Sequence, residues 1–119
     1  MKILVIDDDL EILKLIGRML RKYGHEVELL QNSADALDVI DKTPGLDAIV
    51  SDVLMPNVDG VEIVQSITKK HPSIWVVAMT GGGRHLPIDM LINSVKAFGA
   101  QGTLNKPFGE AELLAALPH

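Results

Sequence analysis

The sequence contains no cysteine, which excludes disulfide bonds, thiolate metal sites and cysteine nucleophiles. A chain without cysteine is typical of a reducing compartment, and we expect a cytoplasmic protein. Aromatic residues make up only 3% of the chain, so aliphatic side chains must build the core. Platforms that stack nucleic-acid bases are therefore not expected.

Long apolar runs are also missing. The longest runs are strand-sized, such as residues 3–6, and fall far below the roughly 20 residues needed to cross a bilayer. No signal-peptide pattern precedes them, and we expect no membrane association. The formal net charge of -5, with basic residues scattered along the chain, argues against direct nucleic acid binding.

A length of 119 residues matches one ordinary domain that folds around its own core. The sequence shows no internal repeat, linker or low-complexity segment. We therefore predict a single domain over residues 1–119, with no output domain in this chain. The end of the sequence is compatible with a stand-alone protein and with a domain cut from a longer regulator.

Short apolar runs alternate with segments of helical period, a pattern that predicts an α/β fold with a parallel sheet. We expect five strands, at residues 2–6, 26–30, 48–51, 74–79 and 102–104. Near-continuous apolar residues in the first and fourth strands indicate helices on both faces of the sheet, as in a doubly wound fold.

Five helices are expected between and after these strands. The first has Gly24 as its stop signal, the second covers residues 34–41, and the third begins at an Asp59 N-cap. A short fifth helix ends before Pro118. The fourth is predicted from the apolar spacing of Ile88, Leu91, Ile92, Val95 and Phe98.

Polar residues stand where the apolar strands stop. Asp7, Asp8 and Asp9 follow the first strand, Asp52 the third and Thr80 the fourth, and Lys106 follows the fifth. In an open parallel sheet, ligands bind outside the carboxyl ends of the strands. We therefore expect these side chains to converge at one edge.

Carboxylates gathered at one edge repel one another, and a hard divalent cation such as Mg²⁺ would offset their charge. Lys106 offers a positive charge for an anion, and Thr80 offers a hydroxyl donor. A carboxylate in that setting can attack phosphorus while its neighbours stabilise the transferring oxygens. The arrangement predicts a phosphorylatable aspartate.

Each residue also has an ordinary structural explanation. For Asp9 we favour a cap on the first helix, because it immediately precedes the periodic segment. Asp52 could start a turn, while Thr80 and Lys106 could be a strand-end hydroxyl and a solvated lysine. The joint occurrence of these residues, in order at strand ends, favours the functional interpretation.

The whole chain resembles the response regulator receiver family of two-component signalling. Any one of the matching motifs is weakly specific, but the four in this order are highly specific. They are residues 3–9 (ILVIDDD), 52–60 (DVLMPNVDG), 76–81 (VVAMTG) and 105–108 (NKPF). The resemblance implies a flavodoxin-like receiver fold with strand order 2-1-3-4-5.

The resemblance also implies roles for residues. Asp52 would be the phosphoacceptor, and Mg²⁺, or Mn²⁺ in its place, would be bound by Asp7, Asp8, Asp52 and the backbone carbonyl of Leu54. By the same resemblance, Thr80 and Lys106 would contact the phosphoryl group. The protein would then be a phosphoprotein that catalyses only its own phosphorylation and dephosphorylation.

Partners follow from the resemblance as well. The phosphoryl donor would be a sensor histidine kinase or a histidine phosphotransfer protein. A downstream protein, or a second copy in a homodimer, would bind the fourth helix, fifth strand and fifth helix. The sequence names neither the kinase nor the target.

One position departs from the family pattern. Members commonly carry an aromatic residue three positions before the lysine, where this chain has Thr103. We therefore do not expect the usual coupling between the threonine and an aromatic residue. We expect the glycine-rich loop at residues 81–87 and the helix after it to carry the signal instead.

Two alternative functions remain open. An aspartate-nucleophile phosphohydrolase of the haloacid-dehalogenase type would use Asp7 and Asp9 as its Asp-x-Asp pair, but Leu10-Glu11 replaces the expected Gly-Thr. A degenerate receiver that acts only as an interaction module is the other alternative, and the complete set of polar residues argues against it.

Overall fold

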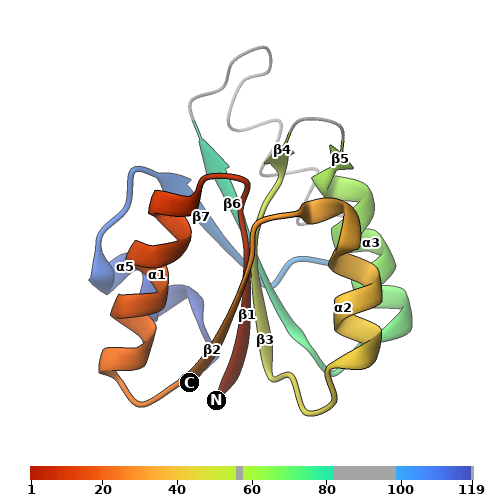
Figure 1. Cartoon of the computed structure of the whole chain (residues 1–119), viewed down its shortest axis with the longest axis horizontal. Helices are drawn as coiled ribbons and strands as arrows, with labels where there is room; N and C mark the ends of the chain where they lie inside the picture. Colours follow the sequence, from red (N-terminus) through yellow and green to blue (C-terminus); the bar gives the residue numbers. More distant parts are fainter. Residues whose placement is uncertain (56–57, 82–98, 119) are drawn as a thin grey trace.

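The computed structural model describes residues 1–55, 58–81 and 99–118. Its helices and strands follow one another in an alternating βα order (Figure 1). In chain order they are β1 (Lys2–Ile6), α1 (Leu10–Lys22), β2 (Glu26–Leu30), the 3-10 turn η1 (Ser33–Asp35), α2 (Ala36–Lys42), β3 (Ala48–Asp52), β4 (Leu54–Met55), β5 (Val58–Asp59), α3 (Gly60–Lys70), β6 (Trp75–Gly81), β7 (Gly102–Lys106) and α5 (Glu110–Ala116).

The main sheet has five strands in the order β2-β1-β3-β6-β7, and every neighbouring pair is parallel. Numbered along the sheet, this is the order 2-1-3-4-5, which confirms the predicted doubly wound α/β fold. The strand order reverses between β1 and β3. Ligands of such sheets bind outside the carboxyl ends of the strands at that reversal.

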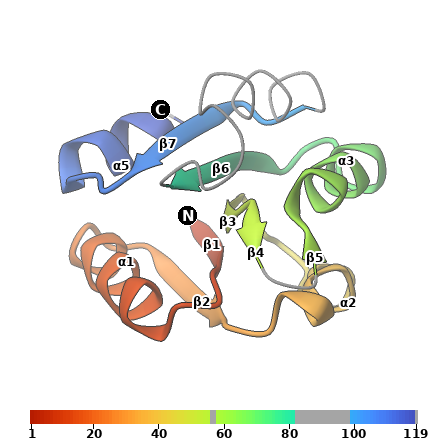
Figure 2. The ribbon, with the colours of Figure 1, turned by 90° about the horizontal axis from the view of Figure 1, so that it is seen from above.

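Helices cover both faces of the sheet. Figure 1 and the view from above in Figure 2 place α1 and α5 on one face and α2 and α3 on the other. One apolar core includes Leu13, Leu20 and Leu113 under α1 and α5, and the other includes Ile40 and Ile67 under α2 and α3. All five residues of β3 are buried, as expected for a central strand covered on both sides.

Two helix ends carry the predicted signals. The Asp9 carboxylate accepts hydrogen bonds from the backbone N–H groups of Glu11 and Ile12 and so caps α1. Gly24, just beyond the end of α1, has a φ of 86°, a left-handed conformation that suits glycine. Both predictions for the first helix are confirmed.

Three other helix predictions have mixed outcomes. The second helix was expected from residue 34, but a 3-10 turn occupies Ser33–Asp35 and the α-helix begins at Ala36. α3 begins at Gly60, directly after Asp59, as an N-cap at that position requires. The predicted fourth helix, with Val95 and Phe98, lies outside the described residues, as does most of the glycine-rich loop. Among the helices that the structure describes, none has the length and apolar character needed to span a bilayer.

Candidate functional site

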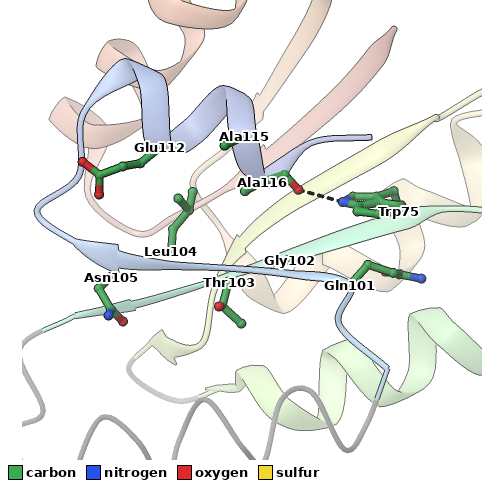
Figure 3. A pocket seen from close by; sticks show the side chains of 9 residues that line it. All are labelled: Trp75, Gln101, Gly102, Thr103, Leu104, Asn105, Glu112, Ala115 and Ala116. Atoms are coloured by element: carbon green, nitrogen blue, oxygen red, sulfur yellow. Dashed lines mark hydrogen bonds between the residues drawn. The ribbon is translucent and has the colours of Figure 1, made fainter. Parts of the chain in front are cut away.

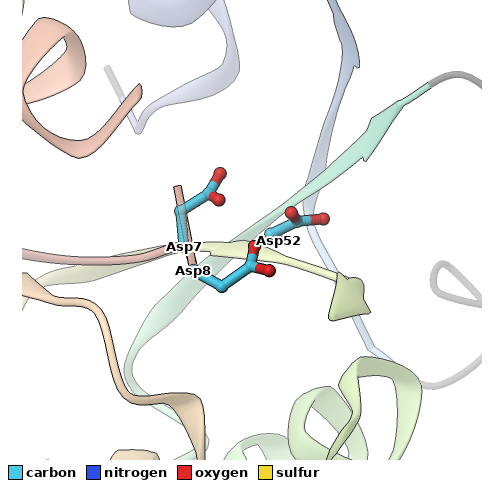
Figure 4. A group of neighbouring side chains, drawn as sticks. All are labelled: Asp7, Asp8 and Asp52. Atoms are coloured by element: carbon cyan, nitrogen blue, oxygen red, sulfur yellow. The ribbon is translucent and has the colours of Figure 1, made fainter. Parts of the chain in front are cut away.

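Three aspartates meet where β1 and β3 end. Ile6 of β1 is in register with Ser51 of β3, so Asp7 and Asp52 follow at the same edge of the sheet. Oxygen atoms of Asp7, Asp8 and Asp52 lie within 4.8 Å of one another (Figure 4). Asp7 is fully buried and Asp52 is 4% exposed, whereas Asp8 is exposed. The predicted acidic group is therefore assembled, with one of its members facing solvent.

Asp9 does not belong to this group. Its carboxylate caps α1, while its backbone N–H donates to Asp7 Oδ1 at 2.9 Å. The capping prediction for Asp9 thus holds, and its backbone also fixes the orientation of the Asp7 carboxylate. An Asp-x-Asp pair made of Asp7 and Asp9 would need the second carboxylate at the site, where the structure does not place it.

Lys106, at the end of β7, connects the two buried carboxylates. Its Nζ lies 2.7 Å from Asp7 Oδ2 and 2.9 Å from Asp52 Oδ2, and its side chain is 19% exposed. Low exposure and two short contacts exclude a merely solvated lysine. The peptide bond from Lys106 to Pro107 is cis.

Gly81 makes room for that lysine. Gly81 and Lys106 are register partners on β6 and β7. A Cβ at position 81 would lie 3.0 Å from Lys106 Cδ and 3.1 Å from Lys106 Cβ, which is tighter than ordinary packing. The missing side chain therefore lets the lysine stem run along β6 toward the aspartates, a role that the sequence did not indicate.

Burial and charge have opposite effects on the ionisable groups of the site. Burial raises the pKa of the Asp7 carboxyl above its ordinary value, against the hydrogen bonds from Lys106 and from the Asp9 backbone. Burial alone would lower the pKa of Lys106, but its hydrogen bonds to Asp7 and Asp52 outweigh that effect and raise it. Lys106 is therefore a cation throughout the physiological pH range, and Asp7 is the carboxylate that burial destabilises.

The donor set fits a hard divalent cation. Among the described residues, Asp7, Asp8 and Asp52 offer carboxylate oxygens as ligands, which Mg²⁺ and Mn²⁺ prefer. Three carboxylates and the single ammonium of Lys106 leave an excess of two negative charges, which one such ion balances. Leu54 begins β4 two residues after Asp52. That its backbone carbonyl binds the metal stays a prediction.

Thr80 follows Met79, the register partner of Asp52, on β6 and is fully buried. Its Oγ1 donates to Asn105 Oδ1 at 2.7 Å and lies 3.3 Å from the Leu104 carbonyl oxygen. Asn105 was not predicted as a site residue. Its place beside Thr80 follows from the parallel register of β6 and β7, in which Asn105 pairs with Thr80 and Lys106 with Gly81.

The face formed by β7 and α5 has an open hollow of about 470 Å³. Figure 3 shows Thr103, Asn105 and Trp75 among the side chains that line it. Trp75 Nε1 donates to the Ala116 carbonyl at 2.9 Å, so this tryptophan ties the end of α5 to the sheet. Thr103 occupies the position where an aromatic residue was expected, so β7 presents a small side chain to this hollow.

Comparison with known proteins gives consistent matches. The family model for the response regulator receiver domain matches residues 3–118. The transcriptional regulatory protein CpxR homolog of Haemophilus influenzae is 32% identical over 116 residues, which cover 98% of this chain and 48% of that protein. The chain thus spans about half the length of the curated relatives it matches.

Solved structures agree with the sequence matches. A response regulator receiver domain protein from Clostridium thermocellum superposes with a TM-score of 0.84 at 34% identity, covering 97% of this chain and 89% of that one. A response regulator from Burkholderia pseudomallei with a phosphorylated aspartic acid and a calcium ion superposes with a TM-score of 0.82 at 26% identity. That match covers 98% of this chain and 66% of the other.

Proposed function

The chain belongs to the response regulator receiver family, and on that premise we propose that Asp52 is its phosphoacceptor. The observation that carries the proposal is the double contact of Lys106 Nζ with the buried carboxylates of Asp7 and Asp52, which share an acidic cluster with the exposed Asp8. A cation fixed beside an otherwise repulsive carboxylate lets a phosphate-bearing donor approach it. Receiver domains of this family work with histidine kinases and are not enzymes in the usual sense.

In the proposed reaction, a carboxylate oxygen of Asp52 forms a bond to the phosphorus atom of the donor. The bond from phosphorus to the donor's histidine nitrogen, or to the oxygen of acetyl phosphate, breaks, and its electron pair stays with that atom. Lys106, already within 2.9 Å of Asp52, donates to a phosphoryl oxygen. The Thr80 hydroxyl donates to another.

A divalent cation bound by Asp7, Asp8, Asp52 and the Leu54 carbonyl would neutralise charge between the carboxylates and the phosphoryl oxygens. Exposed Asp8 would complete such a site from the solvent side, and buried Asp7 would anchor it. The Asp9 N–H keeps one oxygen of Asp7 engaged. The orientation of Asp7 is thereby fixed before any ligand arrives.

We further propose a single receiver domain over residues 1–119 that acts in the cytoplasm as a phosphoprotein. Its phosphoryl donor would be a sensor histidine kinase or a histidine phosphotransfer protein. The face formed by β7 and α5, with its open hollow, supports downstream binding there. The haloacid-dehalogenase alternative loses support because Asp9 caps α1.

The test is to incubate the protein with acetyl phosphate and Mg²⁺ and to measure its intact mass. We expect an increment of one phosphoryl group in the native protein and in Asp38→Asn, an exposed control on α2, and no increment in Asp52→Asn. Omitting the metal with a chelator should suppress the reaction. A phosphorylated Asp52→Asn protein would contradict the assignment, and an unmodified native protein would support a degenerate receiver.

A further inference from the structure

The Thr80 hydroxyl is already engaged in the unphosphorylated protein. It has one hydrogen, and the 2.7 Å contact with Asn105 Oδ1 is much shorter than the 3.3 Å contact with the Leu104 carbonyl. The shorter distance is near the usual length of a hydroxyl hydrogen bond. Asn105 is therefore the acceptor of this proton.

The sheet itself builds this pair. Thr80 and Asn105 are register partners on the parallel strands β6 and β7, so their side chains leave the same face of the sheet. Figure 3 shows Thr103 and Asn105 on one side of β7, while Leu104 points to the other side, toward α5. Two adjacent strands thus present a hydroxyl and its acceptor without any loop in between.

A single proton cannot be donated to two acceptors. A phosphoryl group on Asp52 and the Asn105 carboxamide therefore compete for the Thr80 hydroxyl. Since Asn105 is exposed, water can form a hydrogen bond with its carboxamide when the Thr80 hydroxyl no longer does. Exchanging the hydrogen-bond partner therefore has a small free-energy cost and is reversible. It alters a polar contact on β7, the strand that lacks the aromatic residue at position 103.

From these contacts we propose that Asn105 is a positioning residue that holds the Thr80 hydroxyl away from the phosphoryl site, and that phosphorylation of Asp52 breaks the Thr80–Asn105 hydrogen bond. This inference rests on the proposed function. In this proposal, the side chains of Thr80 and Asn105 link the active site to β7. Removing Asn105 as an acceptor should therefore favour the phosphorylated arrangement.

The test measures affinity for beryllofluoride, a mimic of the phosphoryl group, by calorimetry in the presence of Mg²⁺. Asn105→Ala should bind it about two- to tenfold more tightly than the native protein, the range expected for one lost competing hydrogen bond. Asn105→Asp keeps an acceptor oxygen at this position and should show no gain. Circular dichroism of each variant establishes that it is folded.

A double-mutant cycle separates this competition from other effects of the substitution. In a Thr80→Ala background the hydroxyl is absent, so Asn105→Ala should no longer change the affinity. An equal gain in both backgrounds, no gain in either, or a gain in Asn105→Asp would overturn the inference while leaving Asp52 as the acceptor. Failure of the native protein to bind beryllofluoride would instead remove the proposed function and this inference with it.

Discussion

The environment of Asp7 differs from that of an ordinary carboxylate. It is fully buried, it faces Asp52, and its charge is offset by Lys106 and by the N–H of Asp9. The pKa of Asp7 nevertheless lies above its ordinary value, with burial as the largest cause. Asp7 therefore serves the site at the expense of the stability of the fold.

Replacing Asp7 by Asn should stabilise the metal-free protein at neutral pH, because burial raises the pKa of the Asp7 carboxyl and so disfavours its charged form in the folded state. The folded protein holds its Asp7 proton to higher pH than the unfolded chain, whose value is near 3.8. Native stability should therefore fall as pH rises from 3.8 through the raised pKa, and this part of the fall should be absent in Asp7→Asn.

Urea unfolding in a chelator, followed by circular dichroism across this pH range, measures both effects. The exposed control Asp38→Asn should leave the pH profile unchanged. Added Mg²⁺ should stabilise the native protein more than Asp7→Asn, because the variant loses a ligand. A less stable Asp7→Asn protein at neutral pH would show that the pair with Lys106 outweighs the cost of burial.

Among single residues, those that end a strand and carry charge were predictable from sequence. Asp52 and Lys106 stand out because each is a charged residue at the end of a predicted strand, after residues 48–51 and 102–104 respectively. Asn105 was not predicted as a site residue, and the packing of Gly81 against Lys106 was not predicted either. Their roles depend on which residue lies opposite on the next strand, and the register between β6 and β7 cannot be read from either strand alone.

At the scale of elements, the apolar pattern located the strands but ended three of them too early. β3 extends to Asp52, β6 to Gly81 and β7 to Lys106, and backbone pairing continues through these residues. Hydrophobicity reports burial, whereas strand pairing is made by the backbone of any residue. The site residues are thus held by the sheet itself. The short β4–β5 pair was missed because two-residue strands show no period.

α1 depends on its cap. Asp9→Ala should lower the free energy of unfolding by about 1 kcal/mol, because the N–H groups of Glu11 and Ile12 lose their acceptor. Asp9→Ser, which retains a capping oxygen, should recover most of the loss. Both variants should still accept a phosphoryl group, since the backbone N–H that orients Asp7 remains.

Urea midpoints compare the stabilities of the Asp9 variants and the native protein. Intact mass after acetyl phosphate treatment measures whether each variant is phosphorylated. Loss of phosphorylation in Asp9→Ala with a folded protein would assign the Asp9 carboxylate a direct part in the chemistry. That result would also revive the Asp-x-Asp alternative.

On the scale of the whole molecule, an apolar core packs on each face of the sheet. The polar site residues lie at the carboxyl ends of the strands. α5 closes one side, and its last turn lies against β6 and β7. The Ala116 carbonyl accepts a hydrogen bond from Trp75 Nε1, and a Cβ on Gly102 would lie only 2.6 Å from the same oxygen. Gly102 therefore sets how closely α5 can approach the sheet.

Gly102→Ala should destabilise the protein by about 1–3 kcal/mol, because a backbone oxygen must move to admit the new methyl group. The neighbouring substitution Thr103→Ala adds no atoms and should have a much smaller effect. Urea unfolding followed by circular dichroism compares the two. An unchanged midpoint for Gly102→Ala would mean that the end of α5 shifts freely.

The contact between Trp75 and Ala116 has one more consequence. Trp75 is the only tryptophan in the chain, and its indole N–H is bonded where α5 meets the sheet. Its strand also carries Thr80, so the indole and the Thr80 hydroxyl share β6. The tryptophan fluorescence of the native protein therefore reports on the packing of α5 against the sheet, without an added label or a substitution.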